Sequence, residues 1–265
     1  MEHCLQVEVE LIMKVVLLAG GFGTRISEYT DVIPKPMIPI GGKPMLWHIM
    51  EGFARHGHKD FIIAAGYKAQ IIKEYFLNYR SLNSDFSINL KNGDIEQIGG
   101  DEVNWKVTII DTGELTMTGG RVKRLRDIVG DQPFLVTYGD GLSDVAINRL
   151  IKFHTEHGKI ATVTAVRPQA RFGELELEGD LVKSFQEKPQ MQDGWINGGF
   201  FVFDPKIFDY IDGDDTLLER EPLENLARKG ELMAYHHEGF WCCMDTKRDH
   251  EFLEKMWLSG AKWVG

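Results

Sequence analysis

Short apolar segments alternate with amphipathic ones along most of the 265 residues. Five apolar, β-branched runs have the length and composition of buried strands; they span residues 14–19, 60–65, 105–111, 133–138 and 159–166. The segments between them have helical spacing; they span residues 44–57, 68–79, 118–129 and 143–157, the last with Ser143 as its N-cap. Strands separated by helices require parallel crossovers. The pattern therefore predicts an α/β fold with a doubly wound, mixed but mostly parallel, Rossmann-like sheet.

The second half of the chain is less regular. Two β-rich runs flank Gly179-Asp180 and predict a hairpin over residues 174–185. Residues 195–203 predict a strand that Gly198-Gly199 interrupts, and helical segments follow at 205–210, 222–229 and 248–258. Residues 81–104 are polar and weakly patterned, which fits either a β-excursion or a mobile loop.

One domain is expected over residues 13–265, divided at about residue 165 into a larger first half and a smaller, β-rich second half. Residues 1–12 precede the first strand and are expected to be an appended extension, either disordered or an extra edge strand. They lack the basic and long apolar regions of a secretory signal.

Composition narrows the function classes. Apolar residues make up 43% of the chain, enough for a full core, and 40 acidic against 30 basic residues give a net charge of −10. Such a balance argues against a nucleic acid or an anionic membrane as partner. The three cysteines have no metal-ligand spacing and indicate a reducing cytoplasm. No apolar run approaches the roughly 20 residues of a membrane span.

A glycine-rich turn follows the first strand. It reads Gly20-Gly21-Phe22-Gly23-Thr24-Arg25, and Pro34-Lys35-Pro36 comes ten residues after the arginine. Backbone N–H groups in such a turn suit a polyphosphate, while Arg25 adds a forked cation and Lys35 a point cation. A dinucleotide fingerprint would need glycine at Ile26, and Gly42-Lys43-Pro44 is no Walker A loop. A tight turn without a ligand is the alternative reading.

Two aspartates have the surroundings of magnesium ligands. Asp140 lies between two glycines directly after the run 133–138, and Asp245 follows the aromatic Gly239-Phe240-Trp241. Mg²⁺ takes one or two protein carboxylates together with phosphate oxygens and water. Each residue could instead be a turn aspartate that caps the next helix. Serine, cysteine and histidine form no recognisable nucleophile arrangement.

The stretch from Leu17 to Lys43 resembles the signature of the sugar-1-phosphate nucleotidyltransferases. The likeness continues through Gly66-Tyr67-Lys68, Glu187-Lys188-Pro189 and Asn197-Gly198-Gly199 to about Trp257. Within that family, residues 111–121 resemble the element that glucose-1-phosphate cytidylyltransferases place near the nucleotide. Two departures are visible: Ile33-Pro34-Lys35-Pro36 lacks the first lysine of the common Lys-Pro-Lys-Pro, and Cys242-Cys243 stands where a glutamine is expected.

The resemblance implies a role for each matching residue. It assigns Mg²⁺ to Asp140 and Asp245, and catalysis to Arg25, Lys35 and Lys188. It assigns the nucleotide to Leu18, Ala19, Gly20, Gly21, Phe22, Gly23, Thr24, Arg25, Lys35, Thr116 and Arg121. It assigns the sugar phosphate to Glu187, Lys188, Asn197, Gly198 and Gly199.

The implied reaction joins CTP to α-D-glucose 1-phosphate, giving CDP-glucose and pyrophosphate by in-line attack on the α-phosphate. The resemblance also implies a cytoplasmic homo-oligomer that supplies CDP-deoxysugars for lipopolysaccharide O antigen and other bacterial surface polysaccharide. Two alternatives stay open: use of UTP or dTTP in place of CTP, and a regulatory homologue that binds nucleotide without turnover. No single residue establishes cytosine recognition.

Overall fold

The computed structural model describes residues 11–100, 103–168, 174–178, 181–186 and 194–264. Seven strands form the main sheet; in spatial order they are β14 (Leu232–His237), β10 (Ala161–Val166), β13 (Ile196–Phe203), β8 (Phe134–Tyr138), β1 (Val15–Ala19), β4 (Asp60–Ala65) and β7 (Lys106–Asp111). β13 runs antiparallel to both of its neighbours, and the other pairings in this sheet are parallel. The predicted mixed, mostly parallel α/β fold is confirmed.

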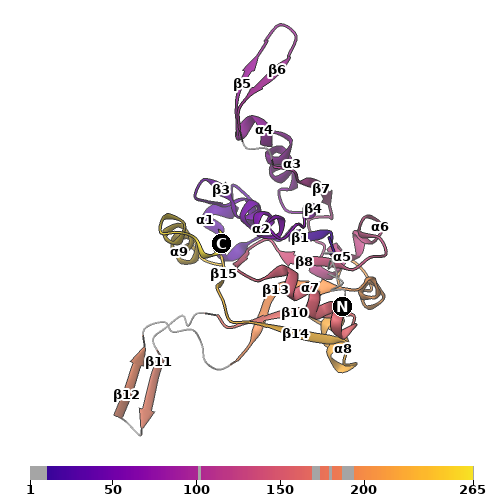
Figure 1. Cartoon of the computed structure of the whole chain (residues 1–265), viewed down its shortest axis with the longest axis vertical. Helices are drawn as coiled ribbons and strands as arrows, with labels where there is room; N and C mark the ends of the chain where they lie inside the picture. The colour runs from indigo at the N-terminus through magenta and orange to yellow at the C-terminus, as the bar shows by residue number, and fades with distance from the viewer. Residues whose placement is uncertain (1–10, 101–102, 169–173, 179–180, 187–193, 265) are drawn as a thin grey trace, which may run out of the picture.

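Helices cover both faces of the sheet (Figure 1). One face packs against α2 (Met45–Ala54), α3 (Ala69–Leu77), α7 (Ile147–His157) and α9 (Lys247–Leu258). The other packs against α5 (Thr118–Arg124), α6 (Arg126–Val129), the 3-10 helix η3 (Pro205–Tyr210) and α8 (Glu221–Arg228). Alternate residues of β1 enter the two cores, which explains why its whole run is apolar.

The order of the strands reverses beside β1. The chain passes from β1 to β4 and β7 on one side, and then returns to β8 on the other side of β1. The loops after β1 and β8 therefore diverge at a topological switch point, at the carboxyl ends of the strands. Ligands of open α/β sheets bind in this position.

Three local expectations were wrong. The segment 118–129 is split into α5 and α6 at Leu125. Helix α7 begins at Ile147, because Ser143 belongs to β9 (Gly141–Ser143), which pairs with β15 (Trp241–Cys243), and its Oγ donates to the Phe240 carbonyl. The glycine pair does not interrupt β13; a register irregularity in the pairing with β10 absorbs it.

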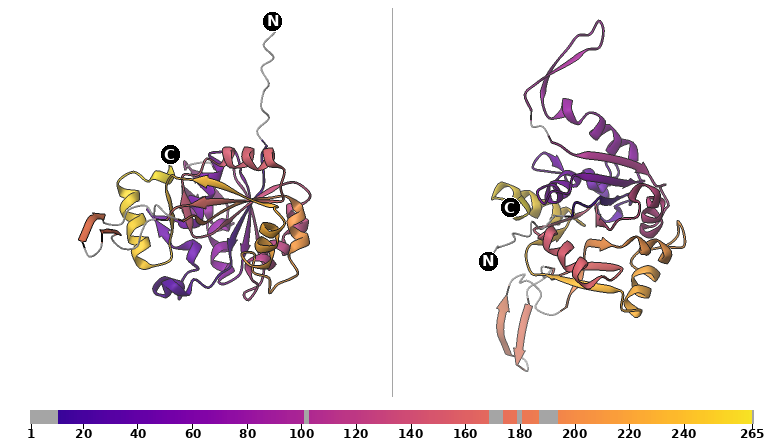
Figure 2. Two further views of the ribbon diagram at one scale, coloured as in Figure 1. Left: turned by 90° about the horizontal axis from the view of Figure 1, so that it is seen from below. Right: turned by 45° about the vertical axis from the view of Figure 1, so that its right-hand side comes forward.

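Two hairpins project from the body of the molecule (Figures 1 and 2). The first joins β5 (Asp85–Ile88) to β6 (Ile95–Ile98), which decides for the β-excursion in residues 81–104. The second joins β11 (Glu174–Glu178) to β12 (Leu181–Gln186), as predicted. Residues 1–10 of the expected extension lie outside the described residues, while Leu11 and Ile12 are exposed and have no regular structure.

The remaining elements are short; they are η1 (Thr24–Ile26), α1 (Ser27–Thr30), η2 (Lys35–Met37), β2 (Pro39–Ile40), β3 (Lys43–Pro44), α4 (Tyr79–Leu82) and η4 (Lys262–Val264). Among the described residues, no helix combines the length and apolar character that crossing a lipid bilayer demands.

Candidate active site

The glycine loop leaves the carboxyl end of β1 with its backbone turned outward. Gly23 has a left-handed φ of 64°, and a Cβ there would lie 3.0 Å from the Cβ of Lys35. Gly21 faces open space, with nothing within 4 Å of a Cβ built on it. Within the described parts of the chain, no acceptor is assigned to the backbone N–H groups of residues 21–24. These donors are therefore available to an anionic ligand.

Arg121 fixes the start of this loop by a hydrogen bond to the Gly20 carbonyl. Its guanidinium is buried and donates to the main-chain oxygens of Gly20, Ala65, Gly113 and Glu114 and to Thr112 Oγ1, at 2.7–3.2 Å. It thereby ties together the loops that follow β1, β4 and β7. A Cβ on Gly20 would lie 2.1 Å from Arg121 NH1, so only glycine fits there. Arg121 lies inside α5, within the segment 118–129 that the sequence predicts to be helical.

The loops after β4 and β7 complete the nucleotide side. Tyr67 donates its backbone N–H to the Gly20 carbonyl, and its ring lies 5.1 Å from that of Phe22. Phe22 is thus held beside the loop after β4, with 41% of its surface exposed. Thr116 is buried, with Oγ1 2.8 Å from where Gly113 would carry a Cβ. The structure therefore brings Phe22 and Thr116, two of the predicted nucleotide-binding residues, to the carboxyl edge of the sheet.

A cluster of charges lies at the switch point. Lys35 Nζ donates to Asp140 Oδ2 and to Asp245 Oδ1, at 2.6 Å each, and Arg25 NH1 donates to Asp245 Oδ2 at 2.6 Å. Asp140 follows β8, Asp245 follows β15, and both cations come from the segment after β1. Residues up to 220 positions apart in sequence therefore meet in one site.

Burial and charge act in opposite directions on this cluster. Burial alone would lower the pKa of Lys35, but Asp140 and Asp245 outweigh it and hold that pKa above its ordinary value. Burial alone would raise the pKa of Asp245, but the hydrogen bond and charge of Lys35, helped by Arg25, hold that pKa below its ordinary value. The Lys35 ammonium and the Asp245 carboxylate are consequently ionised together at neutral pH.

The donor set fits a magnesium ion. Asp140 and Asp245 present one oxygen each to a common point, where Lys35 Nζ lies. The described residues contain no group of three or more histidine, cysteine or acidic side chains placed to hold a metal. Mg²⁺ needs only one or two carboxylates, because phosphate oxygens and water complete its octahedron. Burial raises the pKa of Cys243 to about 12, so this neighbour of Asp245 is a neutral thiol and a poor ligand.

A second polar group lines the same edge beyond β8. Asn197 Nδ2 donates to Tyr138 Oη at 3.4 Å, and Tyr138 Oη donates to Glu219 Oε1. Glu219 Oε2 also accepts a 2.6 Å bond from Thr118 Oγ1, at the start of α5. This chain of contacts links the region around β13 with α5, the helix that carries Arg121.

The glycine pair of β13 is explained by packing. Gly199 has a φ of 78°, and a Cβ there would lie 2.4 Å from the ring of Tyr138. A Cβ on Gly198 would lie 2.6 Å from Val166 Cγ1, and the Gly198 carbonyl accepts a bond from Trp241 Nε1. Glu187 and Lys188, the other expected sugar-phosphate residues, lie outside the described residues.

Sequence reasoning missed Tyr138 and Glu219. Tyr138 could have been found, because it directly precedes Gly139-Asp140 at the end of a predicted strand. Glu219 lies in a segment without a strand, a helix or a motif, so only the fold brings it to the site.

Comparison with known proteins identifies the family. Residues 14–248 match the model of the nucleotidyl transferase family. The chain belongs to the nucleotidyl transferase family. A glucose-1-phosphate cytidylyltransferase of Salmonella typhi is 53% identical over 253 residues, which cover 95% of this chain and 98% of that protein. A mannose-1-phosphate guanyltransferase of Neurospora crassa is 30% identical over 91% of this chain and 62% of its own length.

Solved structures show the same nucleotidyl transferase fold. HddC from Yersinia pseudotuberculosis superposes with a TM-score of 0.69 at 26% identity, over 93% of this chain and all of that one. A second structure of HddC, complexed with GMP-PN, has a TM-score of 0.68 at 25% identity. The resemblance inferred from the sequence is therefore confirmed at the level of the family.

Proposed function

We propose that this chain is a glucose-1-phosphate cytidylyltransferase, which converts CTP and α-D-glucose 1-phosphate into CDP-glucose and pyrophosphate. The observation that carries the proposal is the cluster of Lys35, Asp140 and Asp245 beside the glycine loop, in a chain 53% identical to an enzyme of that name. Together with Arg25, this cluster supplies two cations and two carboxylates for the triphosphate side of the reaction.

Positioning and charge are enough for this reaction. The second pKa of a phosphate monoester is about 6, so the sugar phosphate is ionised at neutral pH and attacks without a general base. Its oxygen approaches the α-phosphorus in line, opposite the departing pyrophosphate. The N–H groups of residues 21–24 and the guanidinium of Arg25 stabilise the negative charge that grows on the triphosphate.

Mg²⁺ would be held by Asp140 and Asp245 and, when bound, would neutralise the α-phosphate and the leaving group. Lys35 Nζ, which contacts both carboxylates, would add a positive charge that stabilises the triphosphate. Lys188 orients the sugar phosphate, and Asn197, with Gly198 and Gly199, lines the sugar pocket. Leu18 and Ala19 contribute the end of β1 to the nucleotide pocket.

Cytosine is recognised at the edge formed by Thr116 and the loops that Arg121 holds. Cytosine presents acceptors at O2 and N3, whereas uracil replaces the N3 acceptor with a donor. A buried donor left unpaired costs about 1–3 kcal/mol, so donors aimed at N3 would favour CTP at least tenfold. UTP or dTTP use is the competing assignment within the family.

We further propose that residues 13–165 form the nucleotide-binding half and residues 166–265 the sugar-binding half. The enzyme acts as a homo-oligomer. It works in the cytoplasm, and its small, odd number of cysteines, three, is in keeping with that reducing compartment. Its product would supply CDP-deoxysugars for lipopolysaccharide O antigen or related surface polysaccharide.

Product analysis tests the proposal directly. Purified protein is incubated with CTP, glucose 1-phosphate and Mg²⁺, and the nucleotides are separated by anion exchange and identified by mass. CDP-glucose should form, and its formation should stop on chelation and in Asp140→Ala. Binding of CTP without any nucleotide sugar would instead establish the regulatory homologue.

A further inference from the structure

Arg25 and Lys35, the two cations of the candidate site, are joined by a segment with little regular structure. Residues 25–35, here called the cation segment, contain the four-residue helix α1 and parts of the 3-10 helices η1 and η2. Charges that stabilise a transition state act best when they are fixed before the substrate arrives. Thr30 lies midway in the segment, five residues from each cation. Contacts made to Thr30 therefore bear on the positions of both.

Two side chains from the loop after β4 hold the end of α1. The helix ends at Thr30, and the residue four positions further on is Pro34, which has no N–H to donate to the Thr30 carbonyl. The Tyr67 hydroxyl and Lys68 Nζ donate to this carbonyl instead, at 3.0 Å each. Lys68 Nζ donates to the Asp31 carbonyl as well. The middle of the cation segment is thus bound to a neighbouring loop of the sheet.

The same contacts reach the glycine loop. Thr30 is buried, its Oγ1 donates to the Gly23 carbonyl at 3.2 Å, and a Cβ on Gly23 would lie 2.8 Å from Thr30 Cγ2. Tyr67 donates its backbone N–H to the Gly20 carbonyl at 3.1 Å. Tyr67 therefore contacts the glycine loop through its backbone and the cation segment through its hydroxyl.

The backbone of Lys68 is strained. Its φ of 50° and ψ of 38° are left-handed, and it is the one non-glycine residue with a positive φ in the part of the chain that the structure describes. Glycine adopts this conformation freely, whereas other residues adopt it uncommonly. Strain of this kind is typical of positions at functional sites. Here it accompanies a side chain with two specific acceptors.

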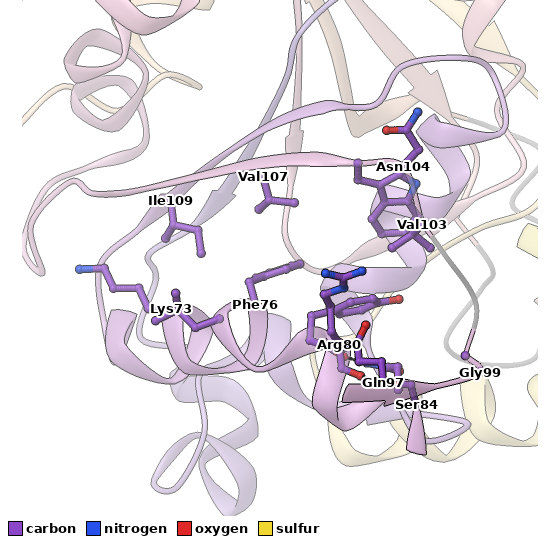
Figure 3. A pocket seen from close by; sticks show the side chains of 15 residues that line it. Lys73, Phe76, Arg80, Ser84, Gln97, Gly99, Val103, Asn104, Val107 and Ile109 are labelled. Atoms are coloured by element: carbon purple, nitrogen blue, oxygen red, sulfur yellow. Dashed lines mark hydrogen bonds between the residues drawn. The ribbon is translucent and has the colours of Figure 1, made fainter. Parts of the chain in front are cut away.

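The loop that carries these side chains has a firm support. Lys68 directly precedes α3, in which Ile72 is fully buried. Further along α3, Phe76 points toward Val107 and Ile109 of β7, the edge strand of the main sheet (Figure 3). The helix is therefore packed on the sheet, and the loop between β4 and α3 is anchored at both ends.

We propose that Tyr67 and Lys68 are positioning residues, which place Arg25 and Lys35 for the triphosphate by holding the end of α1. The inference rests on the proposed function and gives its two cations a support. A misplacement of about 1 Å in a catalytic group can cost about 100-fold in rate. Loss of the support should therefore lower turnover of CTP and leave the use of glucose 1-phosphate nearly unchanged.

Matched substitutions test this support. Lys68→Met should lower kcat/KM for CTP at least about tenfold, mostly through kcat, while KM for glucose 1-phosphate changes less than about threefold. Tyr67→Phe should act in the same direction. Lys68→Arg still offers donors to both carbonyls and should stay within about threefold of the wild type. The control is Lys14→Met, because Lys14 Nζ also donates to two successive carbonyls at a helix end, those of Ile128 and Val129, but at the amino end of β1; its kinetic constants should stay within about threefold of the wild type.

Hydrogen exchange of the nucleotide-free protein gives a readout that needs no turnover. The amides of residues 24–33 should exchange at least about threefold faster in Lys68→Met than in the wild type, and at the wild-type rate in Lys14→Met. Unchanged kinetics in Lys68→Met, an equal loss in Lys14→Met, or lower turnover without faster exchange would each overturn the proposal. If the wild type turns over no nucleotide, the proposed function fails, while the exchange result still decides whether these side chains hold the cation segment.

Discussion

Replacing Lys35 by methionine removes the cation that joins the two site carboxylates. The side chains of Lys35 and Asp245 are only 10% and 12% exposed, so this is a buried ion pair. Removing one partner of a buried pair leaves the other charge without compensation, which costs about 3–5 kcal/mol. Arg25 is 73% exposed and compensates Asp245 weakly, while Asp140 is 31% exposed and can be hydrated.

We therefore expect Lys35→Met to lower the free energy of unfolding by about 3 kcal/mol. For a chain of this length, that loss corresponds to a melting temperature lower by roughly 6–12 °C. The matched control is Lys106→Met, because the pair between Lys106 and Asp60 has a lysine 72% exposed; it should cost less than about 1 kcal/mol. Urea unfolding of both variants, at neutral pH and without metal, provides the measurement.

The pH dependence of the free energy of unfolding tests the same ion pair independently. The folded pKa of Asp245 lies below its unfolded value, so its contribution is present above the unfolded pKa and is lost as pH falls through the folded pKa. Without Lys35, burial dominates and raises that folded pKa, so the variant should lose less stability than the wild type between neutral and acid pH. Equal unfolding free energies for Lys35→Met and Lys106→Met, or parallel acid curves, would refute the reasoning.

Three further predictions concern single residues. Asp140→Ala and Asp245→Ala should each lower kcat at least about 100-fold while the far-ultraviolet spectrum stays native; near wild-type turnover at saturating Mg²⁺ would make that aspartate a mere cap. Arg121→Lys keeps the charge but not the forked geometry, so KM for CTP should rise roughly tenfold and the CTP-over-UTP ratio should narrow; an unchanged ratio would place base recognition elsewhere. Burial lowers the pKa of His154 to about 4, so stability should fall by about 1.4 kcal/mol per unit as pH drops from 6.5 toward 4; His154→Gln should flatten that slope, and an unchanged slope would contradict it.

The sequence predicted the frame of the site because local signals suffice for it. An apolar run that is followed at once by glycines is typical of a central parallel strand, buried on both faces, that ends in a turn. The structure has β1 and the glycine loop at this place. Asp140 was placed for the same reason, directly after a strand. Periodicity and turn chemistry are properties of neighbouring residues, and these residues need nothing more.

The rest depends on contacts between distant segments. Four basic residues crowd residues 121–126, and nothing local shows that Arg121 turns inward to bind carbonyls while Arg124 pairs with the exposed Asp214. Ser143 has the composition of a helix cap, but pairing of β9 with β15, a hundred residues away, decides its role. The bridge between Lys35 and Asp245 spans 210 positions and exists only once the sheet is assembled.

The measurement that tests the central claim most directly is pyrophosphate release with glucose 1-phosphate across CTP, UTP, dTTP and GTP. The account predicts a kcat/KM for CTP at least about tenfold above that for each other nucleotide. It also predicts one CDP-glucose formed per pyrophosphate released. Faster turnover with another nucleotide would contradict the assignment of cytosine, and the absence of turnover with all four would contradict the assignment of the enzyme.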